Sequence, residues 1–197
     1  MVSVALVAED ELSMAVLERV VGLSERPFVV TRRLVEHGCG NIKRSVQKYR
    51  NASHVVPHIV LTDLDQAECP ASLIATWQAG NLPASMLLRV AVRETESWLL
   101  GDRHGFSENF HIALNKLPAA PEDLPDPKQA LINLVRRCGN RRLAAEVVPA
   151  EGSRASIGPL YNERLGAFAR DAWDVDAAAA ACPSLERFRQ RLNTFLL

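Results

Sequence analysis

The chain has 197 residues, of which 48% are hydrophobic and 23% are charged. These proportions are those of an ordinary globular protein, and they exclude collagen, coiled coils and intrinsic disorder. The 23 basic and 23 acidic residues give a formal net charge of zero. Any contact with nucleic acid must therefore come from a local basic patch and not from the charge of the whole chain.

The cysteines and the hydropathy pattern predict a soluble cytoplasmic protein. Cys39, Cys69, Cys138 and Cys182 are far apart in sequence and form no CxxC pair. The first residues do not read as a secretory signal, so we expect reduced thiols. No apolar stretch approaches the roughly 20 residues that a membrane-spanning helix needs. We therefore expect no membrane partner.

Strand-like and helix-like segments alternate over residues 1–104, which predicts a Rossmann-like, mostly parallel sheet of about four strands flanked by helices. The expected strands are 2–8, 28–30, 58–61 and 86–92. The expected helices are 11–21 with Gly22 as its end, a segment capped by Asn41, 71–80 with Gly80 as its end, and a segment from 93 onward.

From about Gly105 the periodic segments are all helical. We therefore predict an α/β core over 1–104 and a helical extension over 105–197 that packs on it as one compact unit. Helices are expected at 106–114, 127–138 and 161–173, with a rigid, proline-rich loop at 115–127. The last helix should be capped by Ser184, and its apolar stripe should pack on the body. That stripe consists of Leu185, Phe188, Leu192 and Phe195.

Four acidic residues stand where the apolar, strand-like runs end: Glu9, Asp63, Asp65 and Glu96. Ligands of open α/β sheets gather at the carboxyl ends of the strands, so these side chains should converge on one crevice. Asp63 and Asp65 are two residues apart and point the same way in extended backbone. Converged carboxylates repel one another unless a cation neutralises them, and Mg²⁺ or Mn²⁺ suits oxygen ligands.

Structural explanations compete with this metal site. Two aspartates beside a turn are common for local hydrogen-bonding reasons, so metal binding and turn formation both stay open for Asp63 and Asp65. A second DxD, Asp174 and Asp176, is better explained by helix capping. Near the fourth strand, Glu96 is the favoured ligand, because Glu94 is better explained as a first-turn glutamate at a helix dipole.

A basic cluster lies further along the chain: Lys128, Arg136, Arg137, Arg141 and Arg142. These side chains could position phosphate groups, although a solvated helix end is the more common explanation of such a cluster. His54 and His58 have HxxxH spacing, but Pro57 between them spoils a helical metal face. The tryptophans fall in helical patterns and are expected in the core.

The acidic pattern resembles that of TOPRIM domains, which have a glutamate after the first strand and a DxD after the third. Here Glu9 and the Asp63, Asp65 pair occupy those positions. The segment RETESWLLGD at 93–102 looks like the signature of a bacterial TOPRIM-like family related to the overcoming-lysogenization-defect (OLD) nucleases. Members of that family are often encoded beside ABC-type ATPases in phage-defence loci. The match continues through 126–128, 161–165 and 182–188.

This resemblance implies a TOPRIM fold and a Mg²⁺-dependent nuclease that acts on nucleic acid, with DNA favoured and an ABC-type ATPase as partner. Asp63, Asp65 and Glu96 would hold one or two Mg²⁺ or Mn²⁺ ions, and Glu9 would be a ligand or general base. Asp102 matches a further family position, but it is equally explained as a helix-end residue. One position departs from the family, because Asp10 stands where a glycine is usual.

Two other functions fit parts of the pattern. A receiver-like signalling module also has an acidic pair after its first strand, here Glu9 and Asp10, and a phosphoacceptor after its third, here Asp63. The expected fifth strand and its lysine are not evident, which weakens that alternative. A degenerate TOPRIM scaffold that binds a partner ATPase without cutting is the second, and Asp10 in place of glycine keeps it open.

Overall fold

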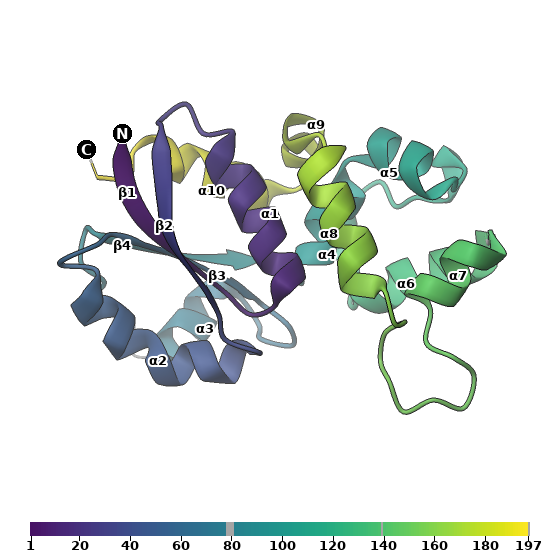
Figure 1. The fold of residues 1–197 in the computed structure, drawn as a ribbon, viewed down its shortest axis with the longest axis horizontal. Coiled ribbons are helices and arrows are strands. Elements are labelled where there is room, and N and C mark those ends of the chain that lie inside the picture. The colour runs from purple at the N-terminus through teal and green to yellow at the C-terminus, as the bar shows by residue number, and fades with distance from the viewer. Residues whose placement is uncertain (78–80, 139, 197) are drawn as a thin grey trace.

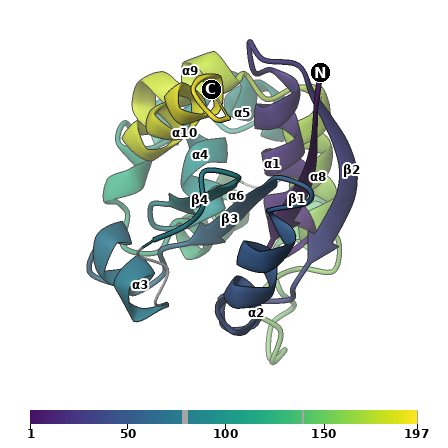
Figure 2. The same ribbon diagram turned by 90° about the vertical axis from the view of Figure 1, so that its left-hand side faces the viewer.

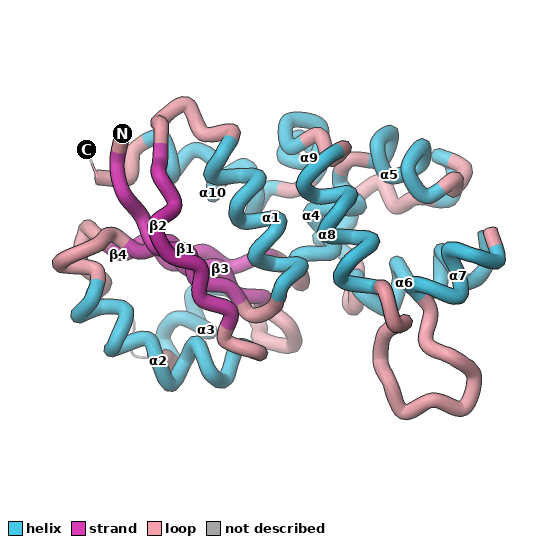
Figure 3. The backbone as a smooth tube through the Cα atoms, in the orientation of Figure 1, coloured by secondary structure: helices cyan, strands magenta, loops and turns pink. Residues whose placement is uncertain are grey.

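The computed structural model describes residues 1–77, 81–138 and 140–196, which form an α/β fold (Figures 1 and 3). Its sheet has four parallel strands in the order β2-β1-β3-β4. The strands are β1 (Val2–Ala8), β2 (Phe28–Val35), β3 (His58–Asp63) and β4 (Met86–Ala91). The predicted class, a parallel four-stranded sheet flanked by helices with a helical C-terminal half, is confirmed.

Helices cover both faces of the sheet, because successive strand side chains point to opposite faces and both sets are apolar. On one face, Val7, Val60 and Leu88 pack with α2 (Cys39–Ala52) and α3 (Pro70–Thr76). The other face packs against α1 (Glu11–Gly22) and α10 (Pro183–Asn193). Figure 2, which looks along the sheet, has α1 and α10 above it and α2 and α3 below.

The remaining helices lie mostly beyond one end of the sheet (Figure 1). Helix α8 packs along α1, α9 packs on α4, and α10 returns to β4, so the C-terminal half contacts the core at several places. These helices are α4 (Thr95–Gly101), α5 (Arg103–Phe110), α6 (Pro127–Cys138), α7 (Arg141–Val147), α8 (Tyr161–Asp171) and α9 (Val175–Ala181). Two short 3₁₀ turns, Leu114–Lys116 and Pro121–Asp123, lie in the proline-rich loop.

Several predicted boundaries were wrong. Strand β2 has eight residues instead of three, because its polar, exposed residues still pair with β1. The helix predicted at 106–114 is α5, which begins at Arg103 and ends at Phe110, where His111 takes a left-handed conformation. Helix α7 was not predicted at all. The predicted end of α3 at Gly80 lies outside the described residues.

Two predicted helix caps were also wrong, because each side chain has another partner. Helix α2 begins at Cys39, and the Asn41 amide donates to the carbonyl of Glu36 at 2.6 Å. Helix α10 begins at Pro183, and the Ser184 hydroxyl accepts from the Trp98 indole at 2.8 Å. The apolar stripe of α10 is buried as predicted.

The aromatic core agrees with the sequence analysis. Trp77, Trp98 and Trp173 are all buried. His58 is buried too, and its Nδ1 lies 2.6 Å from the carbonyl oxygen of Val56, which explains it without a metal. None of the described helices combines the length and the apolar character that crossing a membrane requires.

Candidate functional site at the carboxyl ends of the strands

Glu9 and Asp63 meet at the carboxyl ends of two neighbouring strands. The register pairs Val7 of β1 with Val60 of β3, so the end of β1 lies level with the end of β3. The Glu9 carboxylate accepts a hydrogen bond from the backbone amide of Asp63 at 2.8 Å and another from the Thr62 hydroxyl. The predicted convergence of these two strand ends is thus present in the structure.

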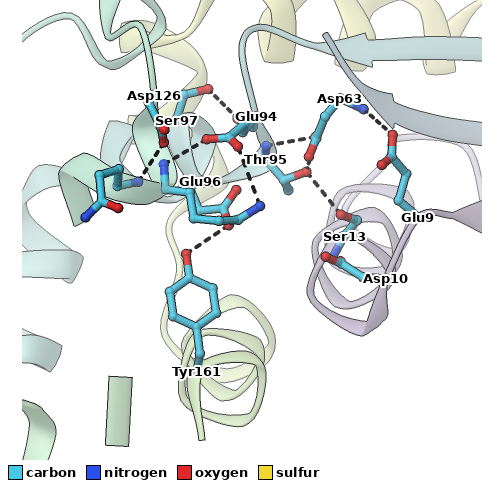
Figure 4. A network of polar contacts seen from close by, with 12 residues as sticks. Glu9, Asp10, Ser13, Asp63, Glu94, Thr95, Glu96, Ser97, Asp126 and Tyr161 are labelled. Carbon is cyan, nitrogen blue, oxygen red and sulfur yellow. Dashed lines mark hydrogen bonds and ion pairs between the residues drawn. The ribbon is translucent and has the colours of Figure 1, made fainter. Parts of the chain in front are cut away.

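Thr95 fixes the Asp63 carboxylate to the start of α4, the helix that follows β4. Asp63 Oδ1 accepts from the Thr95 amide at 2.9 Å and from its hydroxyl at 2.7 Å (Figure 4). Asp63 is only 7% exposed. Burial raises the pKa of this carboxyl well above its ordinary value, and the negative charges of Glu96 and Glu9 raise it further.

Asp10, at the position where the resembled family has glycine, caps a helix. Its Oδ1 accepts from the amide of Ser13 at 2.8 Å, at the N-terminus of α1. The Ser13 hydroxyl lies 3.2 Å from that of Thr95, which joins this cap to Asp63 (Figure 4). The Asp10 side chain therefore has a structural task of its own.

Glu94 and Glu96 share one ammonium group, that of Lys128 in the first turn of α6. Lys128 Nζ lies 3.5 Å from Glu94 and 3.6 Å from Glu96. Glu94 also accepts from the Lys128 backbone amide at 2.8 Å, so it caps α6 rather than its own helix. Glu96 is 2% exposed and accepts from the Tyr161 hydroxyl at 2.9 Å (Figure 4).

The electrostatics of this group follow from its burial. Burial raises the pKa of Glu96 to about 7, since the opposing effect of Lys128 is only partial and the charge of Glu94 adds to the rise. Burial disfavours the Lys128 ammonium, but the charges of Glu96 and Glu94 outweigh it and raise the pKa of Lys128. The pKa of Tyr161 is also raised, by burial and by Glu96, so its hydroxyl stays a donor.

A second group at this edge could hold a metal ion: Glu9, Cys39 and Asp65 each bring one ligand atom within 4.8 Å of the others. Asp65 lies in the turn after β3, with a positive φ of 49°. Within the described ranges, Asp63 and Glu96 belong to no such group. The structure therefore brings two of the four predicted ligands, Glu9 and Asp65, into a metal-binding arrangement and adds a cysteine.

Cys39 was not predicted as a site residue, because the predicted second strand ends at Val30. The strand continues to Val35, so Cys39 stands just beyond its carboxyl end and at the start of α2. The polar run TRR at 31–33 hid the strand, because β2 is an exposed edge without the usual apolar alternation. The full length of β2 follows from its parallel pairing with β1, which the residues of β2 alone do not indicate.

The donor set fits a hard cation better than a thiophilic one. Burial raises the pKa of the Cys39 thiol, and the charges of Glu9 and Asp65 raise it further, so the thiol stays protonated at neutral pH. A protonated thiol is a poor ligand. Two carboxylates completed by water are an ordinary coordination for Mg²⁺, and burial, which raises the pKa of Glu9, makes a neutralising cation favourable there.

Of the predicted basic cluster, only Lys128 contacts the carboxylates at the strand ends, and the four arginines do not. Arg136 and Arg137 lie at the end of α6, and Arg141 and Arg142 begin α7, with all four exposed. Lys128 lies eight residues before Arg136, about 12 Å away along the helix. Arg142 pairs with Glu146 at 3.2 Å.

Asp102 and Asp174 both have structural roles. The buried Asp102 carboxylate accepts from the amides of Gly105 and Asp174, each at 2.9 Å, and so joins the start of α5 to the start of α9. Asp174 in turn accepts from the amides of Asp176 and Ala177 as the N-cap of α9. Capping therefore explains the second DxD, as predicted.

No family model, curated protein or solved structure matches the chain. The TOPRIM resemblance therefore stays a prediction that rests on the motif residues.

Proposed function

We propose that the protein is a Mg²⁺- or Mn²⁺-dependent nuclease that hydrolyses phosphodiester bonds of nucleic acid. The observation that carries this proposal is the approach of Glu9 and Asp65, whose ligand atoms lie within 4.8 Å of each other at the strand ends. The neighbouring Asp63 and Glu96 are buried carboxylates with raised pKa values, a combination that is common in active sites.

Glu9 and Asp65 are the residues that would hold the metal. A bound Mg²⁺ supplies a Lewis acid that polarises a phosphate oxygen and lowers the pKa of a bound water. Glu9 is held for this task by the Thr62 hydroxyl and the Asp63 amide, which fix one of its oxygens. The Cys39 thiol lies beside both ligands, with its sulfur within 4.8 Å of a carboxylate oxygen of each.

Glu96 and Lys128 would serve the reaction without holding the metal. A carboxyl with a pKa of about 7 suits proton transfer near neutral pH. The Lys128 side chain is 32% exposed, so its ammonium can also face a phosphate that enters the site. Arg136, Arg137, Arg141 and Arg142, which are exposed and further along, would bind more distant phosphates of a nucleic acid strand.

The resemblance adds three further parts to the proposal. It favours DNA over RNA as the substrate, an ABC-type ATPase as the partner, and a role in phage defence in the cytoplasm. The exposed cationic side chains are compatible with a nucleic acid substrate, since phosphate contacts need no overall positive charge.

Calorimetric titration with Mn²⁺ and cleavage of supercoiled plasmid test the proposal together. The wild type should bind Mn²⁺ and nick the plasmid, and Asp65→Asn should lose both. Asp176→Asn is the matched control, because Asp176 belongs to the second DxD and lies on α9, so it should behave as the wild type. A wild type that neither binds Mn²⁺ nor nicks the plasmid would refute the nuclease.

One observation favours a non-catalytic scaffold as the second candidate. Lys128 already neutralises Glu94 and Glu96, so part of the acidic cluster is stable without a metal. A scaffold would keep its fold and bind its partner in Asp65→Asn. The receiver-like alternative is weaker, because the described residues hold a four-stranded sheet, without a fifth strand to carry the lysine.

A further inference from the structure

The two edges of the sheet are protected to different degrees. The edge strand β2 is exposed, carries Arg32 and Arg33, and is interrupted by a register shift opposite Val4 and Ala5. Charges and bulges of this kind discourage other chains from pairing with an edge. The edge strand β4 has neither a bulge in its pairing with β3 nor a charged run, and its residues are apolar except for Arg89.

A groove runs along β4 between α3 and α10. It consists of two neighbouring cavities, of about 330 and 90 Å³, that share Ile74 and Leu88 as lining residues. Figure 2, in which β4 faces the viewer between these two helices, gives their arrangement. Most of the residues that line the larger cavity have apolar side chains, among them Leu82, Met86 and Phe195, and Arg191 lines it too.

The backbone of β4 offers unused hydrogen-bonding groups to this groove. The carbonyls of Ser85 and Ala91 accept from β3 and from the turn after it, each at 2.9 Å. Backbone groups of a strand alternate in direction, and β4 pairs with Leu88 opposite Val60, so the amides and carbonyls of Leu88 and Val90 point away from β3. No described residue donates to or accepts from these groups in the groove.

Three arginines face one another on the α10 side of the groove. Arg89 shares a sheet face with Leu87 and Ala91, and that face packs against α10. Arg187 and Arg191 are exposed and four residues apart, so they lie on one face of α10. Among the described residues, none of the three lies within 4.0 Å of a carboxylate oxygen.

The positive charges of the three arginines repel one another, and no described carboxylate pairs with them. Burial lowers the pKa of Arg89, and the positive charges of Arg187 and Arg191 lower it further. Like charges held together in this way are relieved by a ligand of opposite charge. The groove therefore combines strand backbone groups without a partner among the described residues, apolar lining residues, and arginines beside both cavities.

We propose that this groove binds an extended acidic segment of a protein partner, which adds to the sheet as a fifth strand beside β4. Strand addition uses the backbone groups for affinity and side-chain pockets for specificity. Carboxylates of the segment would meet Arg89, Arg187 and Arg191, and its apolar side chains would enter the larger cavity. A polypeptide fits the row of amides and carbonyls better than a phosphodiester backbone does, because only a polypeptide repeats both groups with the spacing of a strand.

An acetylated, fluorescein-labelled heptapeptide of alternating valine and glutamate is the probe for this test. Fluorescence anisotropy should detect its binding to the wild type, and Arg187→Glu/Arg191→Glu should weaken binding by about tenfold or more. Both arginines are exposed and their replacement removes repulsion with Arg89, so the double variant should unfold at the wild-type temperature or above it. The matched control is Lys43→Glu/Lys48→Glu, which changes the charge equally on exposed positions of α2 and should bind as the wild type.

Two N-methylated forms of the peptide test strand addition itself. One carries methyl groups on the amides of its valines and the other on those of its glutamates. A strand bonds to its neighbour through alternate residues, so one form should lose binding and the other should keep it. Equal behaviour of both forms overturns strand addition. Absence of binding at millimolar peptide overturns the proposal. It is also overturned if the wild type binds oligothymidylate but not the peptide, and the double arginine variant abolishes that binding.

Discussion

The acidic cluster at the strand ends has two halves that balance their charge in different ways. In the closed half, the carboxylates of Glu94 and Glu96 share the ammonium of Lys128. In the open half, Glu9 and Asp65 approach the Cys39 thiol, which brings no positive charge. Glu9 is buried, and burial without a cation of its own disfavours its charged form and raises its pKa. Because Lys128 neutralises the closed half, the open half is the one that needs a cation from outside the chain.

Removal of the lysine should have the largest effect on stability. Lys128→Met leaves the carboxylates of Glu94 and Glu96 without their partner, and breaking a buried pair in this way costs about 2–4 kcal/mol, with allowance for the partly exposed lysine. Urea unfolding at pH 8 measures this loss. At pH 5.5 the loss should shrink, because Glu96, with a pKa of about 7, is then protonated in the folded state.

Two further variants make this prediction specific to the closed half. The double variant Lys128→Met/Glu96→Gln should recover most of the stability at pH 8, because the more deeply buried of the two charges is gone and only that of Glu94 remains. Lys43→Met, on an exposed position of α2, should change the free energy of unfolding by less than about 0.5 kcal/mol. A double variant as unstable as Lys128→Met would contradict the charge argument.

The pH dependence of stability should report on Glu96 directly. Its pKa is about 7 in the folded state against an ordinary 4.5, so the unfolded chain releases this proton first. Stability from this carboxyl is therefore full below pH 4.5 and is lost as the pH rises to 7, by at most about 3 kcal/mol. Glu96→Gln should flatten that decline, and chemical unfolding at several pH values measures it.

Asp63 and Glu9 limit how flat the Glu96→Gln profile can become. Burial raises the pKa of both, so they contribute a decline of the same sign in the wild type and in the variant. The difference between the two profiles is thus the quantity to compare. Parallel profiles of wild type and Glu96→Gln would show that Glu96 is already charged throughout this range.

Mn²⁺ should stabilise the protein through the open half alone. At a concentration of 100 times the dissociation constant, a ligand of the folded state adds about 2.7 kcal/mol, which for a chain of this size raises Tm by about 5–10 °C. Asp65→Asn should abolish the rise, since it removes one of two carboxylate ligands. Glu94→Gln, in the closed half, should preserve it. Differential scanning fluorimetry with and without Mn²⁺ distinguishes these outcomes.

The fold was predictable from sequence because its signals are local. Apolar runs such as 2–8 and 58–61 are buried on both faces, and the helix that begins at Pro127 carries its start signal in the sequence. The exposed edge strand β2 lacks the apolar pattern, so its length was missed. Helix α7 was not predicted, because its arginines were interpreted as the solvated end of the preceding helix.

The candidate site was predictable only in outline. The predicted strand ends placed Glu9, Asp63 and Glu96 at the same edge of the sheet. The hydrogen-bond and ion-pair partners of each carboxylate, however, come from residues far away in sequence. Lys128 and Tyr161 come from α6 and α8, and no local pattern indicates that they turn toward Glu96. Long-range packing thus divided a set of carboxylates that looks uniform in the sequence.

The smallest expected effect concerns Cys39, the residue that sequence analysis missed. Its thiol has a raised pKa and so stays protonated beside Glu9 and Asp65. If the open half binds a hard cation through its carboxylates, Cys39→Ser keeps a small, uncharged side chain beside them and should change Mn²⁺ affinity by no more than about twofold. Calorimetry with Mn²⁺ and with Zn²⁺ measures this. A large loss of Zn²⁺ affinity with Cys39→Ser would make the thiol a ligand, and the open half would then be a site for a softer metal.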